Sequence, residues 1–107
     1  MKTARKVMLT EFGSPEKMKL ESVVLPEPAA GEVQLKQTAI GLNFIDIYQR
    51  KGVYPIPLPT GLGHEAAGVV EAVGSEVEGF NPGDRVAYMN AGFGAYADYR
   101  NVPADRL

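Results

Sequence analysis

The sequence predicts a mainly β domain with one short helix. Twelve glycines and eight prolines interrupt a chain of 107 residues, so long helices have little room. Short runs rich in β-branched residues lie between these interruptions, and such runs are typical of strands. Short strands separated by regular turns favour a barrel or a sandwich. A chain of this length corresponds to one domain.

Six strands of ordinary length are expected in order along the chain. They cover residues 6–10, 18–24, 32–39, 66–73, 85–89 and 95–102. The clearest turn between them is the NPGD sequence that begins at Asn81. Proline favours the negative φ that this turn needs at its second position, and glycine permits a positive φ at its third.

One helix is expected near residues 43–51. Asn43 is a suitable N-cap, Asp46 lies in the first turn where the helix dipole favours an anion, and Gly52 can end the helix. Three apolar residues recur at positions i, i+3 and i+4, namely Phe44, Ile47 and Tyr48. The ordinary interpretation of such a stripe is packing against the core.

The composition excludes several classes of function. The net charge is -2 and the basic residues are scattered, so the sequence lacks the positive patch that nucleic-acid binding requires. No apolar run approaches the roughly 20 residues of a membrane-spanning helix, and the first residues lead into a strand. We therefore expect a cytoplasmic protein with neither nucleic acid nor membrane as partner. The absence of cysteine excludes disulfides and thiolate ligands, and His64 is the only histidine.

Residues 61–68 read GLGHEAAG, which fits the G-x-G-x-x-A pattern of a dinucleotide-binding turn. That turn requires a buried strand before it, a helix after it and an acidic residue about 20 positions later. Alternating prolines precede this segment, and adjacent valines that favour a strand follow it. Asp84 stands at the right distance but lies in the NPGD turn. The context therefore favours an ordinary loop.

The same segment raises the alternative of a metal site at His64 and Glu65. A catalytic zinc usually takes three protein ligands, and here only carboxylates such as Asp46 could join the histidine. Adjacent residues on an extended segment point to opposite faces, so His64 and Glu65 could hardly share one ion. We expect no metal. The ordinary interpretations are a hydrogen-bonded loop histidine and a partly buried carboxylate tied to backbone amides or an arginine.

The stretch from Gly41 to Tyr88, GLNFIDIYQRKGVYPIPLPTGLGHEAAGVVEAVGSEVEGFNPGDRVAY, resembles the N-terminal catalytic domain of the medium-chain dehydrogenase/reductase superfamily. Within that superfamily it is most similar to the zinc-independent, zeta-crystallin-like quinone oxidoreductases. The resemblance covers essentially the whole chain, from EFGSPEK to GFGAYADYRNVPADRL. It implies a GroES-like distorted β-barrel over residues 1–107, cut off before the Rossmann nucleotide-binding domain of the complete enzyme.

The resemblance also implies an activity. NADPH, held mainly by the absent domain, would transfer a hydride to a quinone or to a related activated carbonyl or enone, and this chain alone would be inactive. The complete enzyme would be a homodimer. Zinc-dependent relatives have a cysteine at the position of Asn43 and a zinc-binding histidine at the position of His64. This chain keeps only the histidine, which implies a zinc-free site.

The resemblance assigns roles to five residues. Tyr54 and Tyr48 are the expected catalytic donors, because a phenol is protonated at neutral pH and can donate to a developing negative oxygen. Asn43, Asp46, Tyr48 and His64 match positions around the nicotinamide pocket. Quinone reductases often carry a small or hydroxyl residue where His64 stands, so this histidine departs from their pattern. Without the resemblance, Asn43 could be only a cap and Tyr48 only core packing.

Two other functions stay open. A zinc-free enoyl-thioester reductase of the same superfamily would suit the same tyrosine chemistry. A GroES-type co-chaperonin would share the fold and a similar length but would form rings without catalysis. A co-chaperonin is expected to carry a mobile glycine-rich loop early in the chain. The GSPEK segment that begins at Gly13 is short and is followed at once by a strand.

Overall fold

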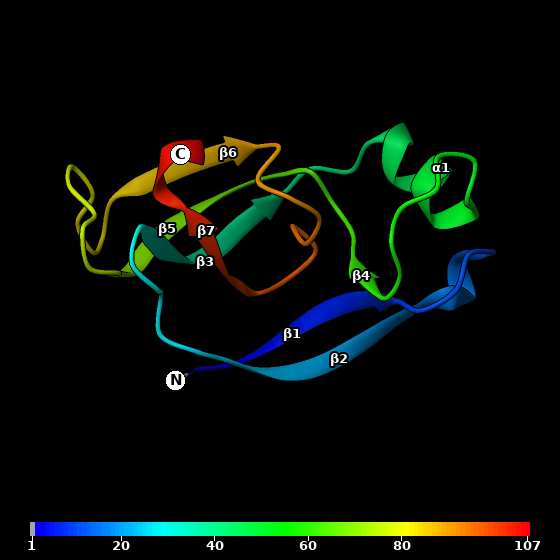
Figure 1. The fold of residues 1–107 in the computed structure, drawn as a ribbon, viewed down its shortest axis with the longest axis horizontal. Coiled ribbons are helices and arrows are strands. Elements are labelled where there is room, and N and C mark those ends of the chain that lie inside the picture. Colours follow the sequence, from blue (N-terminus) through cyan, green and yellow to red (C-terminus); the bar gives the residue numbers. More distant parts are fainter. Residues whose placement is uncertain (1) are drawn as a thin grey trace.

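The structure, a computed structural model, describes residues 2–107. Seven strands, one α-helix and two short 3-10 helices follow one another along these residues (Figure 1). They are β1 (Lys2–Leu9), η1 (Pro15–Lys17), β2 (Met18–Leu25), β3 (Glu32–Ile40), α1 (Phe44–Lys51), β4 (Thr60–Gly61), β5 (Glu65–Val73), β6 (Arg85–Met89), β7 (Tyr99–Pro103) and η2 (Ala104–Arg106).

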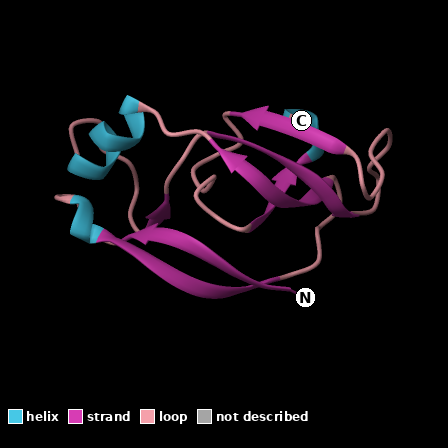
Figure 2. Ribbon diagram, turned by 180° about the vertical axis from the view of Figure 1, so that it is seen from behind, coloured by secondary structure: helices cyan, strands magenta, loops and turns pink. Residues whose placement is uncertain are grey.

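The strands form two antiparallel sheets. One has the order β2-β1-β4 and the other the order β6-β5-β3-β7. Figures 1 and 2 show the two sheets as two layers, with α1 at one end of the molecule. The segment before β7 runs beside β1, where Val7 N–H donates to the Tyr96 carbonyl at 2.9 Å and Asp98 N–H donates to the Arg5 carbonyl at 3.0 Å. This segment connects the layers.

The main core belongs to the four-stranded sheet. Alternate residues of β5 point inward, as the two-residue period of a strand requires. The buried cluster consists of Val33, Leu35, Ala66, Val70, Tyr88, Ala95 and Val102. Partly buried hydrophobic side chains, among them Phe80 and Val86, pack against this cluster.

The mainly β prediction with one helix is confirmed, and the strands lie close to the expected ranges. In residues 2–107 the two sheets stay open rather than joining into one closed sheet. β1 begins at Lys2, earlier than predicted, because its pairing with β2 extends to Leu25. β7 begins at Tyr99 rather than at residue 95, because the residues before it pair with β1, where Ala97 forms an isolated bridge with Lys6. β4 has only two residues and was not predicted.

The helix has the predicted ends. Asn43 precedes it in an extended conformation, and Gly52 ends it in the left-handed region with φ of 85°. Gly83 of the NPGD turn also has a positive φ, of 95°, as predicted. Among residues 2–107, no helix is both long enough and apolar enough to span a bilayer.

Candidate active site

Helix α1 turns its polar side toward the protein. Asp46, Gln49 and Arg50 are its buried residues, and Asp46 is only 3% exposed. Phe44 is 78% exposed and Tyr48 is 41% exposed. The core-packing interpretation of the apolar stripe is therefore wrong for these two residues. Buried polar groups need partners, and the Arg50 guanidinium meets this need by donating to the Gly13 carbonyl.

Asp46 is the centre of the buried polar network. Its Oδ2 atom accepts hydrogen bonds from the Tyr96 hydroxyl at 2.5 Å and from the Asn43 backbone N–H at 3.1 Å. Its Oδ1 atom is buried without a hydrogen-bond partner. Burial of Tyr96, followed by its hydrogen bond to the carboxylate, raises the pKa of the Tyr96 phenol above its ordinary value. Tyr96 therefore acts as a donor to Asp46.

His64 faces the same network from the segment between β4 and β5. Its Nε2 atom lies 2.9 Å from Oε1 of Gln49 and 3.8 Å from Oδ1 of Asp46. The Phe93 ring meets the imidazole edge to face, with ring centroids 5.4 Å apart. Gly63, with φ of 100°, lets the chain turn just before the histidine. The interpretation of His64 as a hydrogen-bonded loop histidine is confirmed.

Asn43 and Glu65 form a second contact beside this network. The Asn43 side-chain amide donates to Oε2 of Glu65 at 3.2 Å. The expected partners of Glu65, backbone amides or an arginine, are thus replaced by a side-chain amide. Gly41 is needed beside it, because a Cβ atom there would come within 2.4 Å of the Glu65 side chain.

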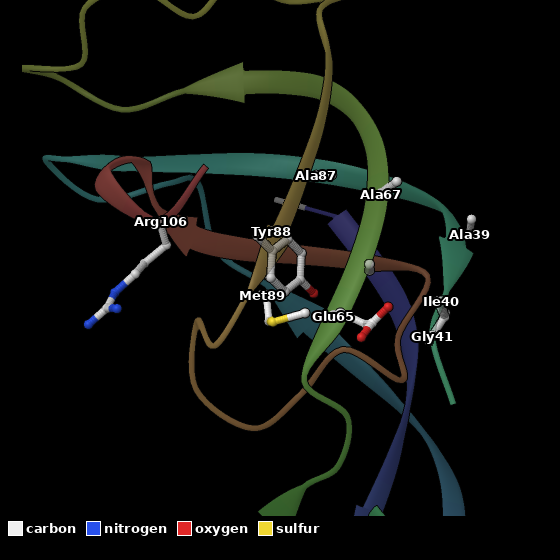
Figure 3. A pocket seen from close by; sticks show the side chains of 10 residues that line it. Ala39, Ile40, Gly41, Glu65, Ala67, Ala87, Tyr88, Met89 and Arg106 are labelled. Atoms are coloured by element: carbon white, nitrogen blue, oxygen red, sulfur yellow. The ribbon is translucent and has the colours of Figure 1, made fainter. Parts of the chain in front are cut away.

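Glu65 also lines an open groove of about 640 Å³. Figure 3 shows its carboxylate between Met89 and Gly41, with Arg106 at the opposite end of the groove. None of the five residues predicted for the site lines this groove. The groove and the buried network therefore adjoin through the contact between Glu65 and Asn43.

Tyr48 and Tyr54 lie on the exposed side of the helix region. Their rings are in edge-to-face contact with centroids 5.5 Å apart, and Tyr54 is 54% exposed. Both side chains are therefore about half exposed to solvent. The predicted site residues are thus divided between a buried network of Asn43, Asp46 and His64 and an exposed pair of tyrosines.

Three residues of the network escaped the sequence analysis, namely Gln49, Phe93 and Tyr96. Gln49 follows Asp46 by three positions, so helical spacing could have placed the two on one face. Phe93 and Tyr96 had no such signal, because they lie on a loop that distant residues hold. Gln37 donates from Nε2 to the carbonyls of residues 95 and 97 at 2.8 Å each, and Arg100 donates to the Ala91 carbonyl at 2.6 Å.

The GLG segment does not form a dinucleotide-binding turn. It runs from β4 into the start of β5, so no helix begins where a pyrophosphate would need a helix N-terminus. Within residues 2–107, no group of three or more histidine, aspartate or glutamate side chains is arranged to hold a metal ion.

Two antiparallel sheets with one flanking helix define a domain of the GroES-like class. The chain belongs to the family "Alcohol dehydrogenase GroES-like domain", which matches residues 29–107. The predicted resemblance to the medium-chain dehydrogenase/reductase superfamily and its quinone oxidoreductases is confirmed.

Its relatives include several reductases. A quinone oxidoreductase of Pseudomonas aeruginosa is 47% identical over 105 residues, which cover 97% of this chain and 32% of the relative. A 2-haloacrylate reductase of a Burkholderia species is 43% identical over 100 residues, which cover 89% of this chain and 30% of the relative. The chain thus spans about a third of the length of such relatives.

A comparison with a solved structure agrees with these sequence similarities. The Escherichia coli quinone oxidoreductase complexed with NADPH superposes with a TM-score of 0.91 at 44% identity. The superposition covers 95% of this chain and 32% of the other.

Proposed function

We propose that this chain is the catalytic, substrate-side domain of an NADPH-dependent quinone oxidoreductase, which transfers a hydride to a quinone or a related activated carbonyl or enone. The observation that carries the proposal is the 44% identity and TM-score of 0.91 with a quinone oxidoreductase complexed with NADPH. The polar network and the exposed tyrosines supply hydrogen-bonding groups suited to such a site.

The domain organisation is part of the proposal. Residues 1–107 would form the GroES-like domain, and a Rossmann domain that holds most of the NADPH would follow. The coverage of only 32% of the relatives supports this arrangement, as does the GLG segment that leads into a strand. We expect the complete enzyme to be a cytoplasmic, zinc-free homodimer, and we expect this chain alone to be inactive.

The residues divide into those that contact ligand and those that support them. Tyr54 and Tyr48 are the proposed donors to the oxygen on which negative charge develops, because preformed donors stabilise such a charge. Asn43 and His64 would border the nicotinamide. Asp46 is buried, so its part in the nicotinamide pocket would be to hold His64 and Tyr96 from behind. NADPH supplies the hydride when bound.

A second acceptor class follows from one relative. One relative, 43% identical over 100 residues, is named 2-haloacrylate reductase, and a 2-haloacrylate is an activated alkene. An enone or an enoyl thioester is an activated alkene of the same kind. The alternative of a zinc-free enoyl-thioester reductase therefore remains worth testing beside the quinone.

The first experiment is the intact mass of the purified gene product together with its NADPH-dependent reduction of 1,4-benzoquinone, with and without a chelator. We expect a protein about three times as long as this chain, since the chain covers 32% of its relatives. We also expect activity that the chelator does not change. Substituting crotonyl thioester for the quinone in the same assay separates the two acceptor classes.

Two results would contradict the proposed function. Loss of activity with the chelator, restored by Zn²⁺, would contradict the zinc-free site. A gene product of only this length that forms rings and does not oxidise NADPH would contradict the enzyme and favour the co-chaperonin.

A further inference from the structure

The surroundings of His64 Nε2 determine where the imidazole carries its proton. Two oxygens face this nitrogen, Oε1 of Gln49 at 2.9 Å and Oδ1 of Asp46 at 3.8 Å. Because the Gln49 amide presents its oxygen to Nε2 and the Asp46 carboxylate lies beyond it, we assign the proton of the neutral imidazole to Nε2. In neutral imidazole the other nitrogen then carries a lone pair and no proton. Nδ1 of His64 is therefore an acceptor.

This nitrogen has no hydrogen-bond partner within the described residues. Among residues 2–107, Asp46 Oδ1 is the only buried side-chain nitrogen or oxygen without a hydrogen-bond partner. His64 Nδ1 also has no partner within these residues, so it is not one of the buried atoms. The His64 side chain is 16% exposed, so part of the ring is accessible to solvent.

The ring is held from several sides. Tyr96 and the Asn43 backbone N–H fix the Asp46 carboxylate behind it, and Phe93 packs edge to face against it. Gln49 is itself buried, at 5% exposed, so its amide has little freedom to turn. An acceptor fixed in this way can bind a donor without first losing conformational freedom.

We propose that His64 Nδ1 binds the hydroxyl of a phenol or hydroquinone, with Gln49 as the residue that positions the ring. The proposal rests on the proposed function to the extent that a hydroquinone is the reduced form of a quinone. A reduced acceptor presents an O–H donor where the oxidised one presents only a carbonyl oxygen. His64 would therefore distinguish the product from the substrate by the direction of one hydrogen bond.

The test is nuclear magnetic resonance of the complete protein, labelled with ¹⁵N in its histidine rings, at about pH 8, above the ordinary pKa of an imidazole. His64 is the only histidine of this chain, and the pair of ring-nitrogen signals that a His64→Gln variant lacks belongs to it. We expect the proton on Nε2 and none on Nδ1. Hydroquinone should then shift the Nδ1 resonance, whereas 1,4-dimethoxybenzene, which has the same ring but no hydroxyl, should leave it in place.

Two variants test the role of Gln49. Gln49→Met keeps the length of the side chain but removes the acceptor, so the Nε2 proton should exchange faster with water. The matched control is Gln34→Met, at another buried glutamine whose side chain bonds to Pro26 and Asn101, and this variant should leave the His64 signals unchanged.

Three results would overturn the proposal. They are a proton on Nδ1 of the unmodified chain, an equal effect of the two ring compounds, and no response of Nδ1 to hydroquinone up to its solubility limit. None of these measurements uses NADPH or turnover. A failure of the reduction assay would therefore leave this site standing, and a failure here would leave the reductase assignment standing.

Discussion

The Tyr96 hydroxyl donates a hydrogen bond to Asp46 Oδ2 at 2.5 Å across 50 positions of the sequence. This contact joins helix α1 to the loop before β7, and it gives a buried carboxylate a strong donor. Hydrogen bonds to ionised groups are stronger than those between neutral groups. The position of Asp46, and through it of His64, therefore depends on a residue outside the helix and outside the GLGHEAAG segment.

Removal of this hydroxyl should destabilise the domain. Tyr96→Phe leaves the buried carboxylate with one donor fewer, and an unsatisfied buried group of this kind costs about 1–3 kcal/mol. Urea unfolding at neutral pH measures the change. Tyr48→Phe removes a hydroxyl from an exposed ring and should change the free energy of unfolding by less than about 0.5 kcal/mol. Equal effects of the two substitutions would show that the bond to Asp46 does not stabilise the fold.

The same residue should make stability fall at alkaline pH. The pKa of Tyr96 is raised in the folded chain by burial and by Asp46, whereas the unfolded tyrosine has its ordinary pKa of about 10. Above that pH the unfolded chain releases this proton while the folded chain keeps it, so the unfolded state gains stability. The contribution is complete below about pH 10 and decreases as the pH rises through the raised pKa.

The measurement is the difference in free energy of unfolding between the unmodified chain and Tyr96→Phe. Both proteins contain the same other tyrosines and lysines, so the contribution of those groups to the pH dependence cancels in this difference. It should be constant between about pH 7 and pH 9 and should shrink by about pH 11. A difference that stays constant over the whole range would contradict the raised pKa.

Gly63→Ala should be much more harmful than Gly79→Ala. Both glycines have a positive φ, of 100° and 86°. A Cβ atom on Gly63 would lie 2.7 Å from the Tyr96 ring and 2.9 Å from the Ala95 side chain, whereas one on Gly79 would meet nothing within 4 Å.

The two substitutions separate backbone strain from crowding. Gly79→Ala should cost about 1–2 kcal/mol, which is the cost of the left-handed conformation alone. Gly63→Ala should cost a further amount of about 1–3 kcal/mol because of overpacking. Thermal unfolding of both variants measures this, and equal melting temperatures would mean that the segment before His64 shifts without cost.

The exposed tyrosines are expected to act in turnover rather than in folding. Tyr54→Phe should lower kcat for quinone reduction by the complete enzyme by about 100-fold or more, the effect of removing one preformed donor. Tyr48→Phe should act in the same direction. The control is Tyr99→Phe, because Tyr99 lies in β7 under the Lys2 ammonium, outside the site. Unchanged rates in both Tyr54→Phe and Tyr48→Phe would exclude a phenol as the donor.

The strands and the helix ends could be predicted because their signals are local. Asn43 and Gly52 mark the ends of α1 by their own backbone preferences, and Gly83 marks a turn in the same way. The orientation of α1 could not be predicted from its apolar stripe, because the partners of its polar residues are distant. Arg50 bonds to Gly13, 37 positions away.

The site was predictable only in part for the same reason. The helix and the GLGHEAAG segment drew attention to Asn43, Asp46 and His64, and the structure brings these three together. The loop that carries Phe93 and Tyr96 was predicted as strand from residue 95 onward. Its path is set by the Gln37 and Arg100 side chains, which no local pattern connects with it.

The two sides of helix α1 have different roles, one in the stability of the fold and the other at the exposed surface. Its inward residues, Asp46, Gln49 and Arg50, hold the fold together, while Phe44 and Tyr48 on the other side contribute little to it. Substitutions on the outward side are therefore free of the selection that folding imposes. The ligand specificity of the outward side of α1 can therefore evolve without loss of domain stability. One helix of eight residues thus combines a constrained structural role with a variable binding role.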